Sequence, residues 1–331
     1  EGMNYQKPRP ARLHDNMDVT ALISGGLHTH DRGAPVTKTI KTDSANLRPA
    51  NLVYHQAAHH PQRITYHAPA ALRAVAMALE RPGHIICGLS ALAVFGLPFF
   101  ADSCDTTLFW KVRKTEPPTQ FTPHVLREPN GEWWTVTFQG LSLRISPPDL
   151  AAAHAIMHVR TAKHSWEVFP VQDLAPVDIR TIQLIDAIRR HLPLSPTDLL
   201  AACHKRIERA WIEPLVAQSS DKADSPKETE MRLICQALCD ELRLTLLEQV
   251  PVRNGDRLVT TLDLAIQELK IGIMYDGDHH LERSQRDKDS RINLECAVLG
   301  WQVLRVTVGT LGQLKHFLFQ AIQHQARLLA S

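Results

Sequence analysis

Two aspartates in the last third of the chain, Asp263 and Asp276, have the type and spacing of a divalent-metal site. Asp263 lies in an alternating run, 258–266, that predicts a strand, and Asp276 ends the next predicted strand, 271–276. A four-residue turn would place Asp263 across from Met274, with Asp276 on the same face one diagonal step of about 7–8 Å away. Carboxylate oxygens suit Mg²⁺ or Mn²⁺, which activate water and offset charge at a phosphate. The pair therefore predicts hydrolysis of phosphodiester bonds.

Further polar residues accompany this pair. Glu228 opens a predicted helix and is either a third metal ligand or a helix cap. His279 and His280 are candidates for general base or leaving-group acid because imidazole titrates near neutrality, or they are ordinary surface histidines. Four basic residues are candidates for nucleic-acid phosphate contacts: Arg286, Lys288, Arg291 and Arg305. The interleaved Asp287 and Asp289 also fit an ion-paired helix face.

The elements that must position these residues are read from periodicity and turn signals. Residues 225–228 form a capping-box pattern with Pro226 in the first turn, which predicts a helix to about Arg243. Strands at 244–252 and 258–266 flank an Asn254-Gly255 turn, and a third strand follows at 271–276. Asp263 is thereby expected on the face opposite Leu262 and Leu264, together with Ala265.

The order of these segments and four motifs resemble a known family. The motifs are Leu262-Asp263-Leu264-Ala265, Tyr275-Asp276-Gly277 followed by the His pair, Asp289-x-Arg291-x-Asn293, and Gly-Trp-x-Val-Leu-Arg at 300–305. They are similar to bacterial domains related to the very-short-patch-repair endonuclease, a branch of the PD-(D/E)-x-K nuclease fold. The resemblance covers about residues 225–318. It implies an α/β restriction-endonuclease-like core with a mixed sheet flanked by helices, and metal-dependent cleavage of DNA with Asp263 as a metal ligand.

One position departs from the family pattern. Such domains usually carry Glu two residues before the Asp-Gly pair, where this chain has Met274. A thioether is a poor ligand for a hard cation, so this position cannot supply the second carboxylate. Either Asp276, a backbone carbonyl and Glu228 complete the site, or the nuclease is impaired.

The N-terminal two thirds carry a weaker resemblance. The segment from Gly83 to Pro98 is similar to the Ser-Ala-Ala-x-x-x-Gly-Leu-Pro region of AbiEi antitoxin-like proteins, and it equally fits a buried helix with packing glycines. We expect residues 1–60 to be poorly defined, as a degenerate winged helix with a helical stretch at 19–27. Residues 61–217 are expected to form an α+β region, with a helix at 68–79, short antiparallel strands within 106–145 and helices within 147–215. A polar linker at 218–224 precedes the domain at 225–331.

Length and composition set outer limits on these hypotheses. At 331 residues, with 44% hydrophobic and 22% charged residues, the chain should contain more than one core. The apolar run from Ile85 to Ala101 is broken by glycine and proline, so no membrane span or membrane partner is expected. Six scattered cysteines and the absence of an apolar leader favour reduced thiols in a cytoplasmic protein. The net charge of +2 neither requires nor excludes a nucleic-acid partner.

Two main functions follow, in different classes. The first is a DNA endonuclease that depends on Mg²⁺ or Mn²⁺ and is weakened by Met274. The second is a non-catalytic, DNA-binding transcriptional regulator of the antitoxin kind, in which the nuclease fold serves binding or dimerisation. Both functions predict DNA as a partner, with a protein partner or a second copy of the chain as a further one. A purely structural interaction protein is a third reading, and it leaves the clustered polar residues unexplained.

Overall fold

A computed structural model of the chain describes residues 12–114, 116–277 and 283–330, and it is mixed α+β, which confirms the predicted fold class. The chain divides into two compact units, Glu1–Glu167 with Arg180–Asp221, and Val168–Ile179 with Lys222–Ser331. The division after Asp221 falls inside the segment where the sequence predicts a linker. Within the described residues, no helix is both long and apolar enough to cross a membrane.

The N-terminal unit is built on a six-stranded sheet of order β1-β7-β8-β4-β5-β6. Its strands are β1 (Met17–Asp18), β4 (Ile85–Ile86), β5 (Thr107–Trp110), β6 (His124–Arg127), β7 (Trp134–Phe138) and β8 (Leu141–Ile145). The expectation of antiparallel strands holds for β7 with β8 and is wrong for β5 with β6, which pair in parallel. The long connection between β5 and β6 lets the chain return to the end of the sheet where β5 begins, so that β6 runs in the same direction. A tight hairpin turn would make the two strands antiparallel.

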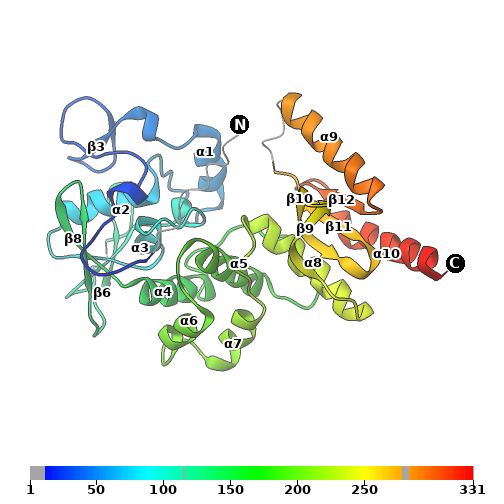
Figure 1. Cartoon of the computed structure of the whole chain (residues 1–331). Helices are drawn as coiled ribbons and strands as arrows, with labels where there is room; N and C mark the ends of the chain where they lie inside the picture. Colours follow the sequence, from blue (N-terminus) through cyan, green and yellow to red (C-terminus); the bar gives the residue numbers. More distant parts are fainter. Residues whose placement is uncertain (1–11, 115, 278–282, 331) are drawn as a thin grey trace. The chain divides into compact units, whose positions relative to one another are not determined.

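Seven helices and a short ribbon complete this part of the described chain (Figure 1). The helices are α1 (Ala50–His59), α2 (Ala70–Leu79), α3 (Gly88–Val94), α4 (Pro148–Arg160), α5 (Pro176–His191), α6 (Pro196–Cys203) and α7 (Arg209–Ala217), and the ribbon joins β2 (Ala34–Pro35) to β3 (Lys41–Thr42). Helix α5 begins in the second unit and continues into the first.

The predicted helical stretch at 19–27 is wrong. A single 3-10 turn, Thr20–Leu22, is present there, because the preceding residues join the sheet instead. Met17 pairs with Val136, and the Val19 amide donates to the Thr137 carbonyl at 2.9 Å. Residues 12–60 contain one α-helix, α1, so the described part of this segment lacks the helix pair that a winged helix requires.

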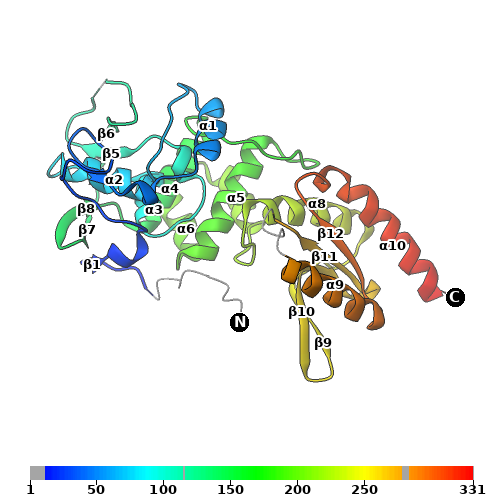
Figure 2. The same cartoon turned by 90° about the horizontal axis from the view of Figure 1, so that it is seen from above.

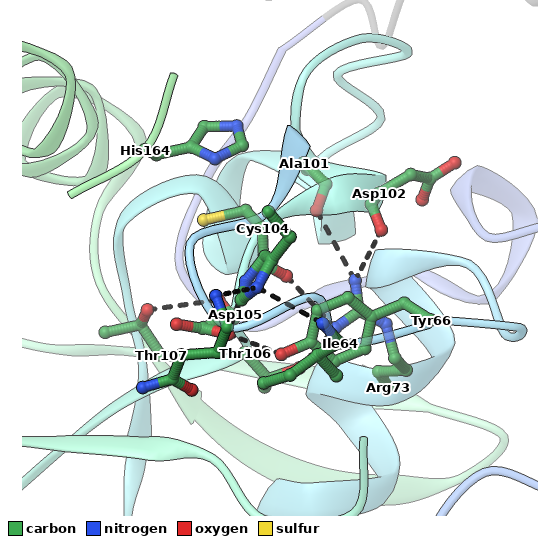
Figure 3. A network of polar contacts seen from close by, with 12 residues as sticks. Ile64, Tyr66, Arg73, Ala101, Asp102, Cys104, Asp105, Thr106, Thr107 and His164 are labelled. Carbon is green, nitrogen blue, oxygen red and sulfur yellow. Dashed lines mark hydrogen bonds and ion pairs between the residues drawn. The ribbon is translucent and has the colours of Figure 1, made fainter. Parts of the chain in front are cut away.

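A fully buried arginine organises the centre of the N-terminal unit (Figure 3). Arg73 donates to Thr106 Oγ1 and to the backbone carbonyls of Ala68, Ala101, Asp102 and Cys104. All five guanidinium hydrogens are used in this way, which offsets the loss of hydration on burial. Because four of its five acceptors lie in the segment from Ala101 to Thr106, just before β5, Arg73 fixes that segment against α2.

Tyr66 and Asp105 extend this network. The Arg73 guanidinium lies 3.8 Å from the centre of the Tyr66 ring, and the Tyr66 hydroxyl donates to the Asp105 carboxylate. The same carboxylate oxygen lies 3.1 Å from His60 Nε2. His60 Nδ1 accepts from the backbone amide of Gln62 at 3.1 Å, so both nitrogens of this ring have a hydrogen-bond partner.

Three further histidines are buried in this unit. His154 and His158 lie on α4, His164 follows that helix, and each is less than 8% exposed. Burial lowers the pKa of His154 to about 4, that of His158 to about 3 and that of His164 to about 4. The fold therefore holds all three rings in the neutral form at pH 7.

We expect the N-terminal unit to be acid-labile. Each of these histidines has a folded pKa below the unfolded value of 6.5, so stability is present above pH 6.5 and is lost as pH falls. Three such groups weaken folding by up to about 4 kcal/mol per pH unit below pH 6. Tryptophan fluorescence during thermal unfolding between pH 7.5 and pH 5 checks this, because five of the six tryptophans lie in this unit. His158→Gln should flatten the dependence, and an unchanged slope in that variant would contradict the assignment.

The C-terminal unit is a four-stranded sheet covered by helices on both faces (Figure 1). Its elements are α8 (Pro226–Leu242), β9 (Leu247–Asn254), β10 (Arg257–Ile266), β11 (Ile271–Tyr275), α9 (Arg283–Val298), β12 (Gln302–Val306) and α10 (Leu314–Ala330). The strand order is β12-β11-β10-β9, with β11 and β12 parallel and the other pairs antiparallel. The β9–β10 hairpin projects from the sheet (Figure 2). The predicted helix and first three strands are confirmed, with ends shifted by up to three residues.

The expected alternation of faces along β10 breaks at Asp263. Gly272 pairs with Ala265, and a Cβ atom at Gly272 would lie 2.7 Å from Leu262 Cδ1. The Leu262 side chain therefore lies on the face of Ala265, and both belong to one apolar cluster with Cys296 of α9. Leu264 lines a pocket on the α8 side together with Asp263. The prediction that Leu262 and Leu264 share a face is wrong. Asp263, which lies between them, pairs with neither neighbouring strand, and the residue opposite it on β9, Gln249, has a left-handed backbone.

Gly272 is thus the position that admits Leu262 into the core. We expect Gly272→Ala to destabilise the C-terminal unit by about 1–3 kcal/mol, because the new methyl group overlaps a fully buried leucine. Thermal unfolding measures this, with Gly309→Ala as the control, since a Cβ there meets its nearest neighbour at 3.8 Å. Equal melting temperatures in the two variants would show that Leu262 relaxes without cost.

Candidate functional site

Glu228 is positioned by the start of α8. The Ser225 hydroxyl accepts from the Glu228 amide at 3.3 Å and donates to Glu228 Oε1 at 2.9 Å. The second carboxylate oxygen, Oε2, accepts from the Asp224 amide at 2.9 Å. Glu228 therefore belongs to the cap of α8, which is one of the two roles that the sequence predicts for it. The same hydrogen bonds hold its carboxylate near β10.

Asp263 is held at the point where β10 becomes irregular. The paired residues of β10 and β11 run from Leu264 to Ile266, so the ladder stops one residue short of Asp263. The Asp263 carboxylate instead accepts from the backbone amide of Tyr275 at 2.7 Å. It also accepts a side-chain hydrogen bond from Gln249, whose backbone is left-handed, with φ of 54°. Asp263 is thus tied to both neighbouring strands.

Asp263 and Glu228 line the same small pocket between α8 and the β9–β10 pair. The other lining residues are Lys222, Ala223, Met231, Arg232, Glu248, Gln249 and Leu264. Glu248 Oε2 lies 3.7 Å from Arg232 Nε, and the Arg232 side chain is 8% exposed. The pocket therefore combines three carboxylates with two cationic side chains.

The two acids in this pocket resist ionisation. Burial, together with the negative charges of Asp263 and Asp224, raises the pKa of Glu228 to about 7, while hydrogen bonds from Asp224 and Ser225 oppose the shift. Burial likewise raises the pKa of Asp263 to about 6, with contributions from Asp224 and Asp276 and opposition from the Tyr275 amide. Carboxyl groups that titrate near neutrality can hold or release a proton, or bind a cation that displaces it.

Asp276 is committed to a different network. Its Oδ1 atom accepts from Arg305 Nη1 at 2.7 Å, and its amide donates to the Val306 carbonyl at 2.7 Å. Arg305 Nε donates to Asn293 Oδ1 at 3.0 Å, and Arg305 Nη2 lies 3.7 Å from Asp289. These contacts join the end of β11 to β12 and to α9. Arg305, a candidate phosphate contact, is therefore an ion-paired residue inside the unit.

The predicted three-ligand metal site is not assembled as expected. Within the described residues, no group of three or more His, Cys, Asp or Glu side chains is arranged to hold a metal ion. The physical reason lies with Asp276, whose carboxylate is turned toward Arg305 while Asp263 and Glu228 share their own pocket. The structure brings two of the three predicted ligands together.

Met274 lies away from this pocket. It packs against the apolar cluster of Val252, Leu262, Ala265 and Cys296 beneath α9. The expectation that Met274 directly faces Asp263 is therefore wrong, because the Asp263 side chain lies on the α8 side of the irregular strand.

The remaining candidates occupy varied positions. His279 and His280 lie outside the described residues. Arg286 and Lys288 fall on α9, but their side chains also lie outside the described set. Arg291 is 71% exposed in its side chain and lies 4.0 Å from Glu295, so it remains accessible on the surface of α9.

Sequence reasoning missed three residues of the pocket. Lys222 belongs to a polar stretch that reads as linker, and Glu248 and Gln249 belong to a strand without a recognisable motif. The single available signal was the four-residue spacing of Glu228 and Arg232, which places both on one face of α8.

Comparisons with protein-family models, curated proteins and solved structures found no match to this chain.

Neutralising Asp263 should stabilise the C-terminal unit at alkaline pH. Because the folded pKa of about 6 exceeds the ordinary value of 3.8, ionisation of Asp263 costs stability as pH rises through this window. Asp263→Asn keeps an acceptor for the Tyr275 amide, and we expect it to add about 1–2 kcal/mol at pH 8 and almost nothing at pH 4. Calorimetry checks this, with the transition of the unit identified as the one that Gly272→Ala shifts.

The control is Asp276→Asn, which weakens the pair with Arg305 and should lower the same transition at pH 8. If Asp263→Asn also destabilised the unit at pH 8, the ionised Asp263 carboxylate would stabilise the fold through its hydrogen bonds, and the prediction would be wrong.

Proposed function

We propose that the C-terminal unit is a metal-dependent DNA endonuclease whose chemistry is centred on Asp263. The observation that supports this most directly is the pairing of Asp263 and Glu228, two part-buried carboxyl groups with raised pKa values, in one pocket. The order of helix, three antiparallel strands, helix and parallel strand is the order that the resemblance to very-short-patch-repair-like nucleases implies.

The donor set of the pocket fits a hard divalent cation. Mg²⁺ usually retains several waters and takes one or two carboxylates together with substrate phosphates, so two carboxylates suffice. Asp263 and Glu228 would hold the metal, which when bound supplies an activated water and offsets phosphate charge. Lys222 and Arg232 line the same pocket and would lie near the charge that develops on the phosphate. Tyr275 and Gln249 would keep Asp263 oriented through their hydrogen bonds.

Plasmid nicking is the decisive experiment. Purified full-length protein should nick supercoiled DNA with Mg²⁺ or Mn²⁺, and Asp263→Asn and Glu228→Gln should each reduce the rate at least about 100-fold. The matched control is Asp256→Asn, an exposed aspartate in the β9–β10 turn of the same unit, which should nick at the wild-type rate. Activity should rise from pH 6 to pH 8, because a metal must displace protons from groups with pKa values of about 6 and 7.

The second candidate function is a non-catalytic DNA-binding regulator of the antitoxin kind. Two observations favour it. The partly buried Met274 packs against an apolar cluster at the position where the family that the chain resembles carries Glu, and Asp276 is paired with Arg305. This function predicts that DNA is retarded in a gel and is not cut with either metal. The absence of nicking by wild-type protein, with DNA binding retained, would replace the endonuclease proposal by this one.

A further inference from the structure

Two aromatic rings are stacked at one end of the N-terminal sheet. The rings of His84 and Trp110 lie 4.2 Å apart between centroids with an angle of 4° between their planes. Gly83 precedes them with φ of +85°, and a Cβ atom there would lie 3.2 Å from the Trp110 ring, so glycine lets the chain pass close to the ring. The parallel pairing of β5 and β6 sets Arg127 beside Trp110.

Cationic side chains surround this stack. Lys111 Nζ lies 5.9 Å from the centre of the Trp110 ring. Burial lowers the pKa of His84, and the positive charges of Lys114 and Arg81 contribute to the same shift. Arg113 is exposed between the two lysines. The ends of β5 and β6, the loop 111–114 and the end of α2 thus gather positive charge at one edge.

This charge is not neutralised within the unit. In the part of the chain that the structure describes, Lys111, Arg113, Lys114 and Arg127 are exposed and take part in no ion pair. The carboxylate that follows β6, Glu128, accepts from Trp133 Nε1 at 2.6 Å and lies 3.9 Å from Arg144. These four exposed cations are therefore available to an external anion.

We propose that His84, Trp110, Lys111, Arg113, Lys114 and Arg127 form a basic edge that binds the phosphate backbone of a nucleic acid. Lysine and arginine contacts to phosphates supply most of the non-specific affinity of nucleic-acid-binding proteins. A protein partner would call for an apolar centre in the interface, whereas the loop of the basic edge exposes a single large apolar side chain, Val112. The stacked rings fix the strand end from which the four flexible cations extend.

The basic edge is independent of the proposed nuclease. It lies in the other structural unit, and it also lies outside residues 1–60, where the antitoxin resemblance would place DNA reading. Binding at this edge therefore holds whether or not Asp263 supports cleavage.

Fluorescence anisotropy of the full chain tests the proposal. The probes are a labelled 20-bp DNA duplex and a single-stranded RNA of 20 nucleotides, each in EDTA so that cleavage does not interfere. For the triple variant K111A/R113A/K114A we expect affinity for the preferred probe to fall at least about tenfold at about 50 mM salt. The slope of log affinity against log salt should become shallower by about 2–3 for duplex DNA. The probe that binds more tightly identifies the kind of nucleic acid.

The matched control is R32A/K38A/K205A, which removes three exposed cations of the same unit from other positions and should leave the affinity within about twofold. Asp263→Asn should bind like the wild type, which separates this edge from the nuclease site. The proposal is overturned if the wild type binds neither probe, if it binds acidic vesicles and no nucleic acid, or if the two triple variants lose affinity equally.

Discussion

The C-terminal site depends on the burial of two carboxyl groups, that of Glu228 at the start of α8 and that of Asp263 on β10. Asp263 and Glu228 lose hydration on burial, and each is partly compensated by hydrogen bonds from backbone amides and polar side chains. Such compensation is partial, since both pKa values stay above their ordinary range. The irregularity of β10, the left-handed Gln249 and the missing side chain at Gly272 are the backbone features that make this arrangement fit.

The N-terminal unit also buries a charged group, but this group is a cation. Arg73 is buried as a cation and is satisfied by carbonyl oxygens, so its charge is spread over a loop and not cancelled by one carboxylate. The surrounding histidines remain neutral because burial penalises their protonation. The two units therefore respond differently to pH. Acid lowers the stability of the N-terminal unit by protonating its buried histidines, and it raises the stability of the C-terminal unit by protonating Asp263 and Glu228.

Much of the fold could be predicted from the sequence. The capping pattern at 225–228 predicted α8, and the Asn254-Gly255 turn predicted the β9–β10 hairpin, because both are local signals. The parallel pairing of β5 with β6 and the recruitment of Met17 to β7 depend on partners more than 10 and 100 residues away, which periodicity does not encode. In the candidate site, Asp263 was found by motif. Lys222 and Gln249 were not, because their roles arise from a linker and a strand that fold back on the pocket.

The network around Arg305 gives the sequence motifs of this unit a structural role. Three of these motifs meet at the Arg305 guanidinium, namely the Asp-Gly pair, the Asp-x-Arg-x-Asn set and the final strand. The contacts of Arg305 with Asp276, Asp289 and Asn293 join β11, β12 and α9. A chain can therefore keep these motifs for the sake of its fold alone, whether or not it carries out a reaction. The motifs around Arg305 thus report on the scaffold, whereas any chemistry of this unit has to be judged from the pocket between Glu228 and Asp263.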